Sequence, residues 1–256
     1  MSVIAINSHS VVMPLLLTTI AGLSTLIGSL IFLFFKRFKN RHLVFCLGLS
    51  AGAMLYVSFI ELLRTAIIDI GFIRANITFI LGILIMLIID MVLPHQYLQE
   101  QEGLNPNYKA LYPAGVFIAA GIALHNFPEG MAVFLSGLTD IHLGIALAVA
   151  IAVHNIPEGI AISIPIYYAT RSKSKAFLFS FFSGIAEPIG AVLIIIWLGD
   201  SVNQHTVSYL FALVAGVMTF ICFDELLPQS YNTDYHKHAI AGILLGMLMM
   251  IASLAI

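Results

Sequence analysis

Long apolar runs alternate with short polar connections along the whole chain of 256 residues. Eight of these runs are long enough to cross about 30 Å of hydrocarbon as a helix. They cover residues 11–35, 43–66, 74–93, 113–136, 142–168, 175–198, 207–228 and 238–256. The longest connection, residues 94–112, is shorter than twenty residues and leaves no room for a soluble domain. The pattern therefore predicts an all-α integral membrane protein with one transmembrane domain over residues 1–256.

The composition agrees with a lipid environment. Hydrophobic residues make up 60% of the chain and charged residues 9%, whereas soluble domains carry about 25% charged residues. The formal net charge is −2, so neither a nucleic acid nor an acidic partner is implied. Cys46 and Cys222 both fall in predicted helices and form neither a disulfide framework nor a CxxC metal motif.

The basic residues predict the orientation of the helices. In this topology nine of the eleven Lys and Arg residues fall on one side: Lys36, Arg37, Lys39, Arg41, Lys109, Arg171, Lys173, Lys175 and Lys237. Because positive residues collect on the cytoplasmic side, we expect a multi-pass protein of the plasma (inner) membrane with both termini outside. A cleaved signal peptide over residues 1–35 is the competing interpretation. It is disfavoured because the basic residues follow the apolar run instead of preceding it.

Two internal repeats are visible in the sequence. Residues 51–63, AGAMLYVSFIELL, match residues 215–227, AGVMTFICFDELL, at seven of thirteen positions. Residues 125–130, HNFPEG, match residues 154–159, HNIPEG. The members of each pair lie in helices that cross in opposite directions, which predicts a 3+2+3 inverted repeat. Many transporters have such repeats and place their substrate site near the midplane, although shared ancestry alone also explains the similarity.

Ionisable residues interrupt the apolar helices at one predicted depth. His125, His154 and Glu187 each lie twelve residues into a helix, roughly 18 Å from its start and close to the bilayer centre. An unpaired carboxylate there costs about 2.5–3.5 kcal/mol, so Glu129, Glu158 and Glu187 need compensating partners. The i,i+4 spacing places His125 with Glu129, and His154 with Glu158, on one helix face. Imidazole and carboxylate are ligands of borderline divalent cations.

The prolines beside these residues loosen the backbone. Pro128 and Pro157 free the carbonyls of Leu124 and Val153 from helical hydrogen bonds. Pro188, which follows Glu187, repeats this arrangement in a third helix. At membrane depth such carbonyls occur only inside protein or beside a water-filled cavity.

Each polar position also has a purely structural interpretation. An isolated His or Asn in a membrane often serves as an interhelical hydrogen bond, but two copies of one motif at fixed spacing disfavour that explanation. Met54 could be a weak thioether ligand or a packing residue. Glu61, Asp224 and Glu225 lie near helix ends and are either solvated ends or an entrance and exit for cations. The many Gly, Ala and Ser residues indicate close helix packing.

The motifs resemble those of a known family. HNFPEG at 125–130, HNIPEG at 154–159 and EPIG at 187–190 are similar to the signature of the ZIP (Zrt/Irt-like) family of divalent metal transporters. AGAM at 51–54 and FDELLP at 223–228 resemble its bacterial ZupT-like branch.

The resemblance implies eight helices in a 3+2+3 inverted repeat that carry divalent metals such as Zn²⁺, Fe²⁺, Mn²⁺ or Cd²⁺ into the cytoplasm through a two-ion site. Nitrogen and carboxylate ligands also suit Co²⁺. The resemblance also implies that one ion is held by Met54, His125, Glu129, His154 and Glu158, and the other by Asn126, Glu129, Asn155, Glu158 and Glu187. Some members have Asp where this chain has Asn155, which lowers the charge of the second site here. The connection 95–109 contains only His95, whereas many members have a His-rich loop there.

No prosthetic group is expected, and no GxxxxGK[ST] phosphate loop is present, so ATP hydrolysis by that route is excluded. The main alternative is an intramembrane metal-dependent hydrolase, because His and Glu at i,i+4 partly match HExxH. Neither motif has the second His. A metal sensor that does not transport is a third interpretation. The sequence leaves open which metal is physiological, whether protons are coupled, and the oligomeric state, a homodimer included.

Overall fold

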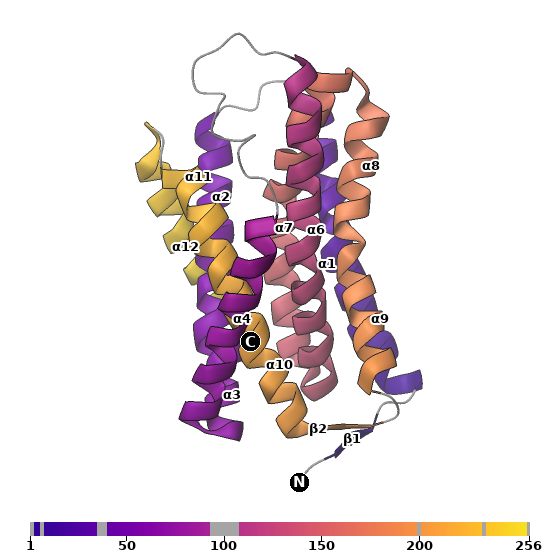
Figure 1. Ribbon diagram of the computed structural model, residues 1–256, viewed down its shortest axis with the longest axis vertical. Helices are drawn as coiled ribbons and strands as arrows, with labels where there is room; N and C mark the ends of the chain where they lie inside the picture. The colour runs from indigo at the N-terminus through magenta and orange to yellow at the C-terminus, as the bar shows by residue number, and fades with distance from the viewer. Residues whose placement is uncertain are drawn as a thin grey trace.

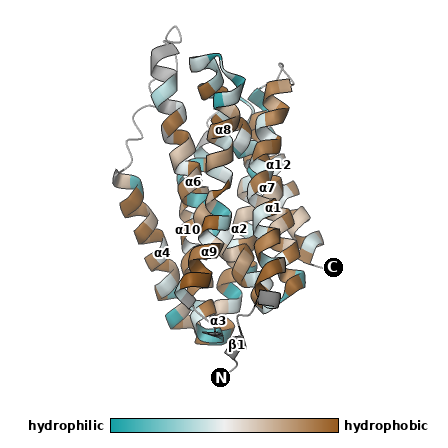
Figure 2. Ribbon diagram, turned by 90° about the vertical axis from the view of Figure 1, so that its right-hand side faces the viewer, coloured by the Kyte–Doolittle hydropathy of each residue, from teal (hydrophilic) through white to brown (hydrophobic). Residues whose placement is uncertain are grey.

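The computed structural model confirms an all-α membrane protein and describes residues 3–5, 8–34, 40–92, 108–198, 201–231 and 234–254. Within these ranges eight helical spans are long and apolar enough to cross a membrane. The first four spans are α1 (Ser8–Phe34), α2–η1–α3 (Asn40–Tyr56, Val57–Leu63, Arg64–Ile70), α4 (Phe72–Val92) and α6 (Tyr108–Thr139). The last four are α7 (Ile141–Thr170), α8–α9 (Lys173–Gly184, Ala186–Leu198), α10–η2–α11 (Gln204–Ile221, Cys222–Leu226, Leu227–Tyr231) and α12 (His236–Leu254). Figure 2, coloured by hydropathy, shows hydrophobic residues recurring along these helices.

Several helices extend beyond their apolar runs, and polar residues explain where they end. Asp140 precedes α7, and its side chain accepts a hydrogen bond from the His142 backbone N–H at 2.8 Å. Such a side chain satisfies a backbone donor that the first helical turn leaves unpaired. Arg171 ends α7 in the left-handed region at φ 54°. Hydropathy locates only the lipid-crossing part of a helix, so its caps determine the true length.

A short β pairing was not predicted. Strands β1 (Val3–Ala5) and β2 (Ser201–Asn203) pair antiparallel, with Val3 opposite Asn203. This pairing joins the start of the chain to the connection between α9 and α10 (Figure 1).

The helices form two groups that lie side by side (Figure 1). One group, which we call the motif bundle, contains α1, α6, α7 and α8–α9. The other, the flanking bundle, contains α2–η1–α3, α4, α10–η2–α11 and α12. The closest helix pairs, such as α1 with α7 and α2 with α12, lie within a bundle. The bundles meet mainly where α2 contacts α7 and where α10 contacts α6.

Glycines allow helices within a bundle to approach at backbone distance. A Cβ atom added at Gly28 would lie 1.9 Å from the Ile156 carbonyl oxygen, and one added at Gly52 would lie 2.1 Å from that of Ile243. Without a large hydrophobic driving force in lipid, such close packing supplies much of the association between helices. Each bundle is therefore closely packed internally.

The inverted repeat predicted from residues 51–63 and 215–227 also has a structural signature. Both segments change from α-helix to π-helix, at Val57–Leu63 and at Cys222–Leu226. These π-helical turns contain Glu61 and Glu225, which occupy equivalent positions in the aligned repeat. π-helical turns are frequent at functional sites. Glu61 and Glu225 are therefore candidates for a role beside the motif residues.

Candidate metal site

The polar residues of the repeated motifs meet inside the motif bundle. Each of them is at most 2% exposed. They are His125, Asn126 and Glu129 on α6, His154, Asn155 and Glu158 on α7, and Glu187 on α9. The structure therefore brings all seven predicted polar ligands into the protein interior.

The two histidines pair with glutamates of the neighbouring helix. His125 Nε2 lies 3.1 Å from Glu158 Oε1, and His154 Nε2 lies 3.0 Å from Glu129 Oε2. Within one helix, His154 Nε2 lies 3.8 Å from Glu158 Oε1. The shortest contacts are thus crossed between α6 and α7. They give the carboxylates of Glu129 and Glu158 polar partners, which offsets part of the cost of burying their charges.

The two asparagines are held by acceptors that fix the direction of their amide groups. Asn155 Nδ2 donates to Glu187 Oε1 and, at 2.8 Å, to the Ala21 carbonyl oxygen on α1. Asn126 Nδ2 donates to the Ser183 carbonyl oxygen on α8 at 3.2 Å. Because the nitrogens are engaged in this way, each Oδ1 atom is left as a free acceptor.

Five buried oxygens of these residues find no hydrogen-bond partner within the described part of the chain. They are Asn126 Oδ1, Glu129 Oε1, Asn155 Oδ1, Glu158 Oε2 and Glu187 Oε2. Buried polar atoms are nearly always satisfied, so a cluster of exceptions requires an explanation. All five are acceptors, and a cation can satisfy several such oxygens at once. The donor set therefore fits a divalent metal ion.

The ligand atoms are not arranged around a common point. Among the described residues, no group of three His, Cys, Asp or Glu side chains is placed to hold one ion. The crossed pairs give the physical reason, since each Nε2 atom faces a carboxylate oxygen instead of a shared centre. A bound cation would replace these contacts with bonds to itself, which requires small side-chain rotations.

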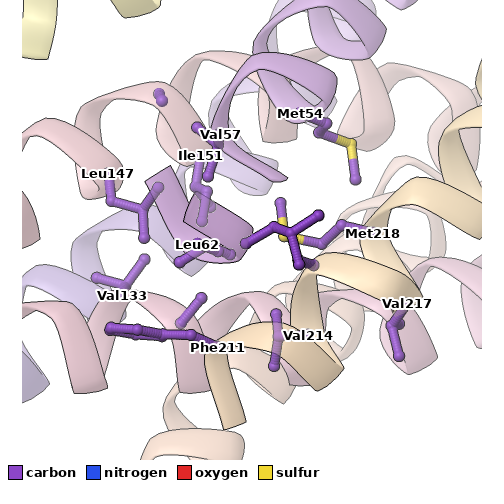
Figure 3. Close-up of a cluster of buried hydrophobic side chains, with 14 of the residues drawn as sticks. Met54, Val57, Leu62, Val133, Leu147, Ile151, Phe211, Val214, Val217 and Met218 are labelled. Atoms are coloured by element: carbon purple, nitrogen blue, oxygen red, sulfur yellow. The ribbon is translucent and has the colours of Figure 1, made fainter. Parts of the chain in front are cut away.

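Met54 lies on the flanking bundle and is 1% exposed. It belongs to the hydrophobic cluster drawn in Figure 3, together with Met218 of the matching repeat. One turn earlier on α2, the Ser50 hydroxyl donates to the His154 carbonyl oxygen at 3.3 Å. Helix α2 therefore contacts the motif segment of α7 directly, while the role of Met54 as a ligand stays a prediction.

An apolar cluster adjoins the site along α6 and α7. Its members, each at most 1% exposed, are Val57, Leu62, Val133, Leu147, Ile151, Phe211 and Val214 (Figure 3). Val133 follows Glu129 by four residues, and Ile151 precedes His154 by three. In the predicted topology the cluster lies on the outer side of the site. The cluster contains side chains from both bundles, so it lies where the two bundles meet.

The other side of the site reaches a partly exposed carboxylate. Glu225 Oε2 lies 3.9 Å from His125 Nδ1, and the Glu225 side chain is 23% exposed. Asp224 is exposed and Glu61 half-buried. No ion pair recorded for the described residues joins either of them to the seven motif residues. Of the three predicted pathway residues, Glu225 is the one that contacts a motif histidine within the described part of the chain.

Sequence reasoning missed three groups that support the motif residues. The carbonyls of Ala21 and Ser183 accept from the asparagines, and the Ser50 hydroxyl reaches α7. In the sequence, small residues such as Ala21, Ser50 and Ser183 indicate only close packing, and backbone carbonyls have no signature at all. His95 and the rest of the connection 95–107 lie outside the described residues.

Comparison with known proteins identifies the family. A family model described as ZIP Zinc transporter matches residues 93–254, which include both HNxPEG motifs and EPIG. A Zinc transporter ZupT of Clostridium perfringens is 43% identical, covering 97% of each chain. One of Chlorobium phaeovibrioides is 46% identical over 94% of this chain and 96% of the relative, and one of Campylobacter jejuni is 42% identical over 96% and 97%. These relatives are named as transporters and give the hydrolase alternative no support. The chain belongs to the ZIP zinc transporter family.

Proposed function

We propose that this protein moves divalent transition-metal cations, Zn²⁺ foremost, across the plasma membrane into the cytoplasm without hydrolysing ATP. The observation that carries this proposal is the cluster of five buried oxygens without partners beside two crossed His–Glu pairs. The zinc transporter names of the relatives support Zn²⁺ as cargo. Nitrogen and carboxylate ligands also suit Fe²⁺, Mn²⁺, Co²⁺ and Cd²⁺.

The site is proposed to hold two ions that share two carboxylates. Glu129 and Glu158 bridge, since each contributes one oxygen to a histidine contact and has a second oxygen without a partner. The first ion is bound on the histidine side by His125 and His154, with Met54 approaching from the flanking bundle. The second ion is bound on the amide side by Asn126, Asn155 and Glu187.

The membrane potential supplies the driving force. A potential of 100 mV, negative inside, is worth about 2.3 kcal/mol per charge and therefore about 4.6 kcal/mol for a divalent cation. We propose that the ion enters past Glu61, reaches the site when the apolar cluster parts, and leaves toward Glu225 and Asp224. The position of Glu225 beside His125 supports the exit, because it offers the first carboxylate outside the site.

Purified protein in liposomes should accumulate Zn²⁺ when a negative-inside potential is imposed. At 100 mV the potential favours accumulation by about three powers of ten. The measurement is the time course of radiolabelled Zn²⁺ uptake, with protein-free liposomes as the control. Competition by unlabelled Fe²⁺, Mn²⁺, Co²⁺ and Cd²⁺ in the same assay ranks the cargo. Saturable binding without accumulation would instead favour a metal sensor.

We propose that Asp224 lies on the cytoplasmic side and His142 outside, with both termini outside. Both residues are exposed, so cysteines placed there should react with a membrane-impermeant maleimide. In cells expressing a Cys46→Ala background, His142→Cys should be labelled in intact cells, and Asp224→Cys only after the membrane is opened. The reverse pattern would contradict the orientation inferred from the basic residues.

A further inference from the structure

The hydroxyl of Ser183 is buried and makes no hydrogen bond to any described residue. Ser183 is 1% exposed, and its Oγ atom has no hydrogen-bond partner within the described residues. Serine and threonine in helices commonly donate to the carbonyl four residues earlier, as Thr170 does to Ile166 and Thr219 to Ala215. Ser183 makes no such bond, so its oxygen keeps both lone pairs available.

Ser183 lies at the end of the site that contains the asparagines. Its carbonyl accepts from Asn126 Nδ2 at 3.2 Å. One turn further along both helices, α6 crosses α9, where a Cβ atom on Gly130 would lie 2.5 Å from Glu187 Cα. Helix α8 ends at Gly184, directly after Ser183, and Glu187 is the second residue of the following helix, α9. Ser183 therefore lies beside Asn126 on one side and next to the turn that leads to Glu187 on the other.

We propose that the Ser183 hydroxyl is a further ligand of the second ion. This inference rests on the proposed two-ion site. With Ser183, that ion is surrounded by oxygen donors alone: two amide oxygens, the carboxylates and a hydroxyl. The first ion also has imidazole nitrogens and, from Met54, a thioether. Oxygen donors suit hard cations, whereas nitrogen and sulfur donors suit softer ones, so the second site favours Mn²⁺ over Cd²⁺.

Two substitutions test this assignment in the purified full-length protein. Bound Mn²⁺ is counted by electron paramagnetic resonance, and we expect two ions in the unsubstituted protein. Ser183→Ala should weaken binding of one of them roughly tenfold or more and leave the other unchanged. Ser183→Cys should add a thiolate-to-metal charge-transfer band in the ultraviolet when Cd²⁺ is bound, since the new thiolate would coordinate it directly.

Ser136 provides the matched control. It is also fully buried with an unpartnered hydroxyl, but lies on α6 seven residues beyond Glu129. Ser136→Ala should bind two Mn²⁺ ions normally, and Ser136→Cys should show only the Cd²⁺ absorption of the native cysteines. The Ser136→Cys spectrum also serves as the baseline for Ser183→Cys.

The outcomes separate this inference from the proposed function. Unchanged Mn²⁺ binding in Ser183→Ala together with no added band in Ser183→Cys overturns the role of Ser183 alone. If the unsubstituted protein binds a single ion, the second site and its Ser183 ligand are both overturned, while transport stands. If it binds no divalent cation, the proposed function itself fails.

Discussion

Replacing Glu129 by Ala should lower metal uptake about a hundredfold or more, close to that of protein-free liposomes. Glu129 is fully buried, and its Oε2 atom is the 3.0 Å partner of His154. Its Oε1 atom has no partner and faces no competing donor among the described residues. As a bridging carboxylate it contributes to both proposed ions, so its loss removes a ligand from each of them.

The measurement is the initial rate of radiolabelled Zn²⁺ uptake into proteoliposomes with an imposed potential. Asp234→Ala is the control, because Asp234 is an exposed carboxylate just before α12 and its loss should leave uptake unchanged. Both variants should be inserted equally well, as shown by monodisperse elution in detergent. A Glu129→Ala protein that is well folded and transports at the normal rate would refute the assigned site.

Replacing Gly28 by Ala should destabilise the motif bundle by about 3 kcal/mol or more. The added Cβ atom would lie 1.9 Å from the Ile156 carbonyl oxygen, 2.8 Å from its carbon and 3.1 Å from the Ile160 nitrogen. All three atoms belong to the backbone, so no side chain can rotate away and the two helices must separate. Helices α1 and α7 are also joined here by a hydrogen bond, which the Asn155 amide on α7 donates to the Ala21 carbonyl on α1.

Thermal unfolding in detergent measures this effect, and Gly121→Ala is the matched control. At Gly121 the nearest atom to an added Cβ is Glu225 Oε1 at 3.7 Å, an ordinary van der Waals distance. We expect a large drop in melting temperature for Gly28→Ala and little change for Gly121→Ala. Equal melting temperatures would show that α1 and α7 are not packed as closely as the structure places them.

Much of the fold could be predicted because the membrane restricts what a chain can do. Within lipid, every backbone polar group must be satisfied internally, so a long apolar run indicates a helix. The eight runs were therefore found, with ends displaced where caps such as Asp140 extend a helix. The break at Ile185, which divides the sixth span into α8 and α9, was not predicted. Hydropathy alone does not mark this turn, although Pro188, which cannot donate a hydrogen bond to the Gly184 carbonyl, lies three residues after it.

The sequence by itself determined that the protein lies in a lipid membrane, how many times it spans that membrane, and which residues are candidate ligands. These follow from composition, run length and local motifs, which are properties of neighbouring residues. Tertiary structure alone decided that His125 pairs with Glu158 and His154 with Glu129, across two helices. It also distinguished Glu225 from Glu61, which occupy equivalent positions in the repeat, by placing only Glu225 beside His125. Such contacts depend on how the two bundles pack against each other, and residues distant along the chain carry no local signal of that packing.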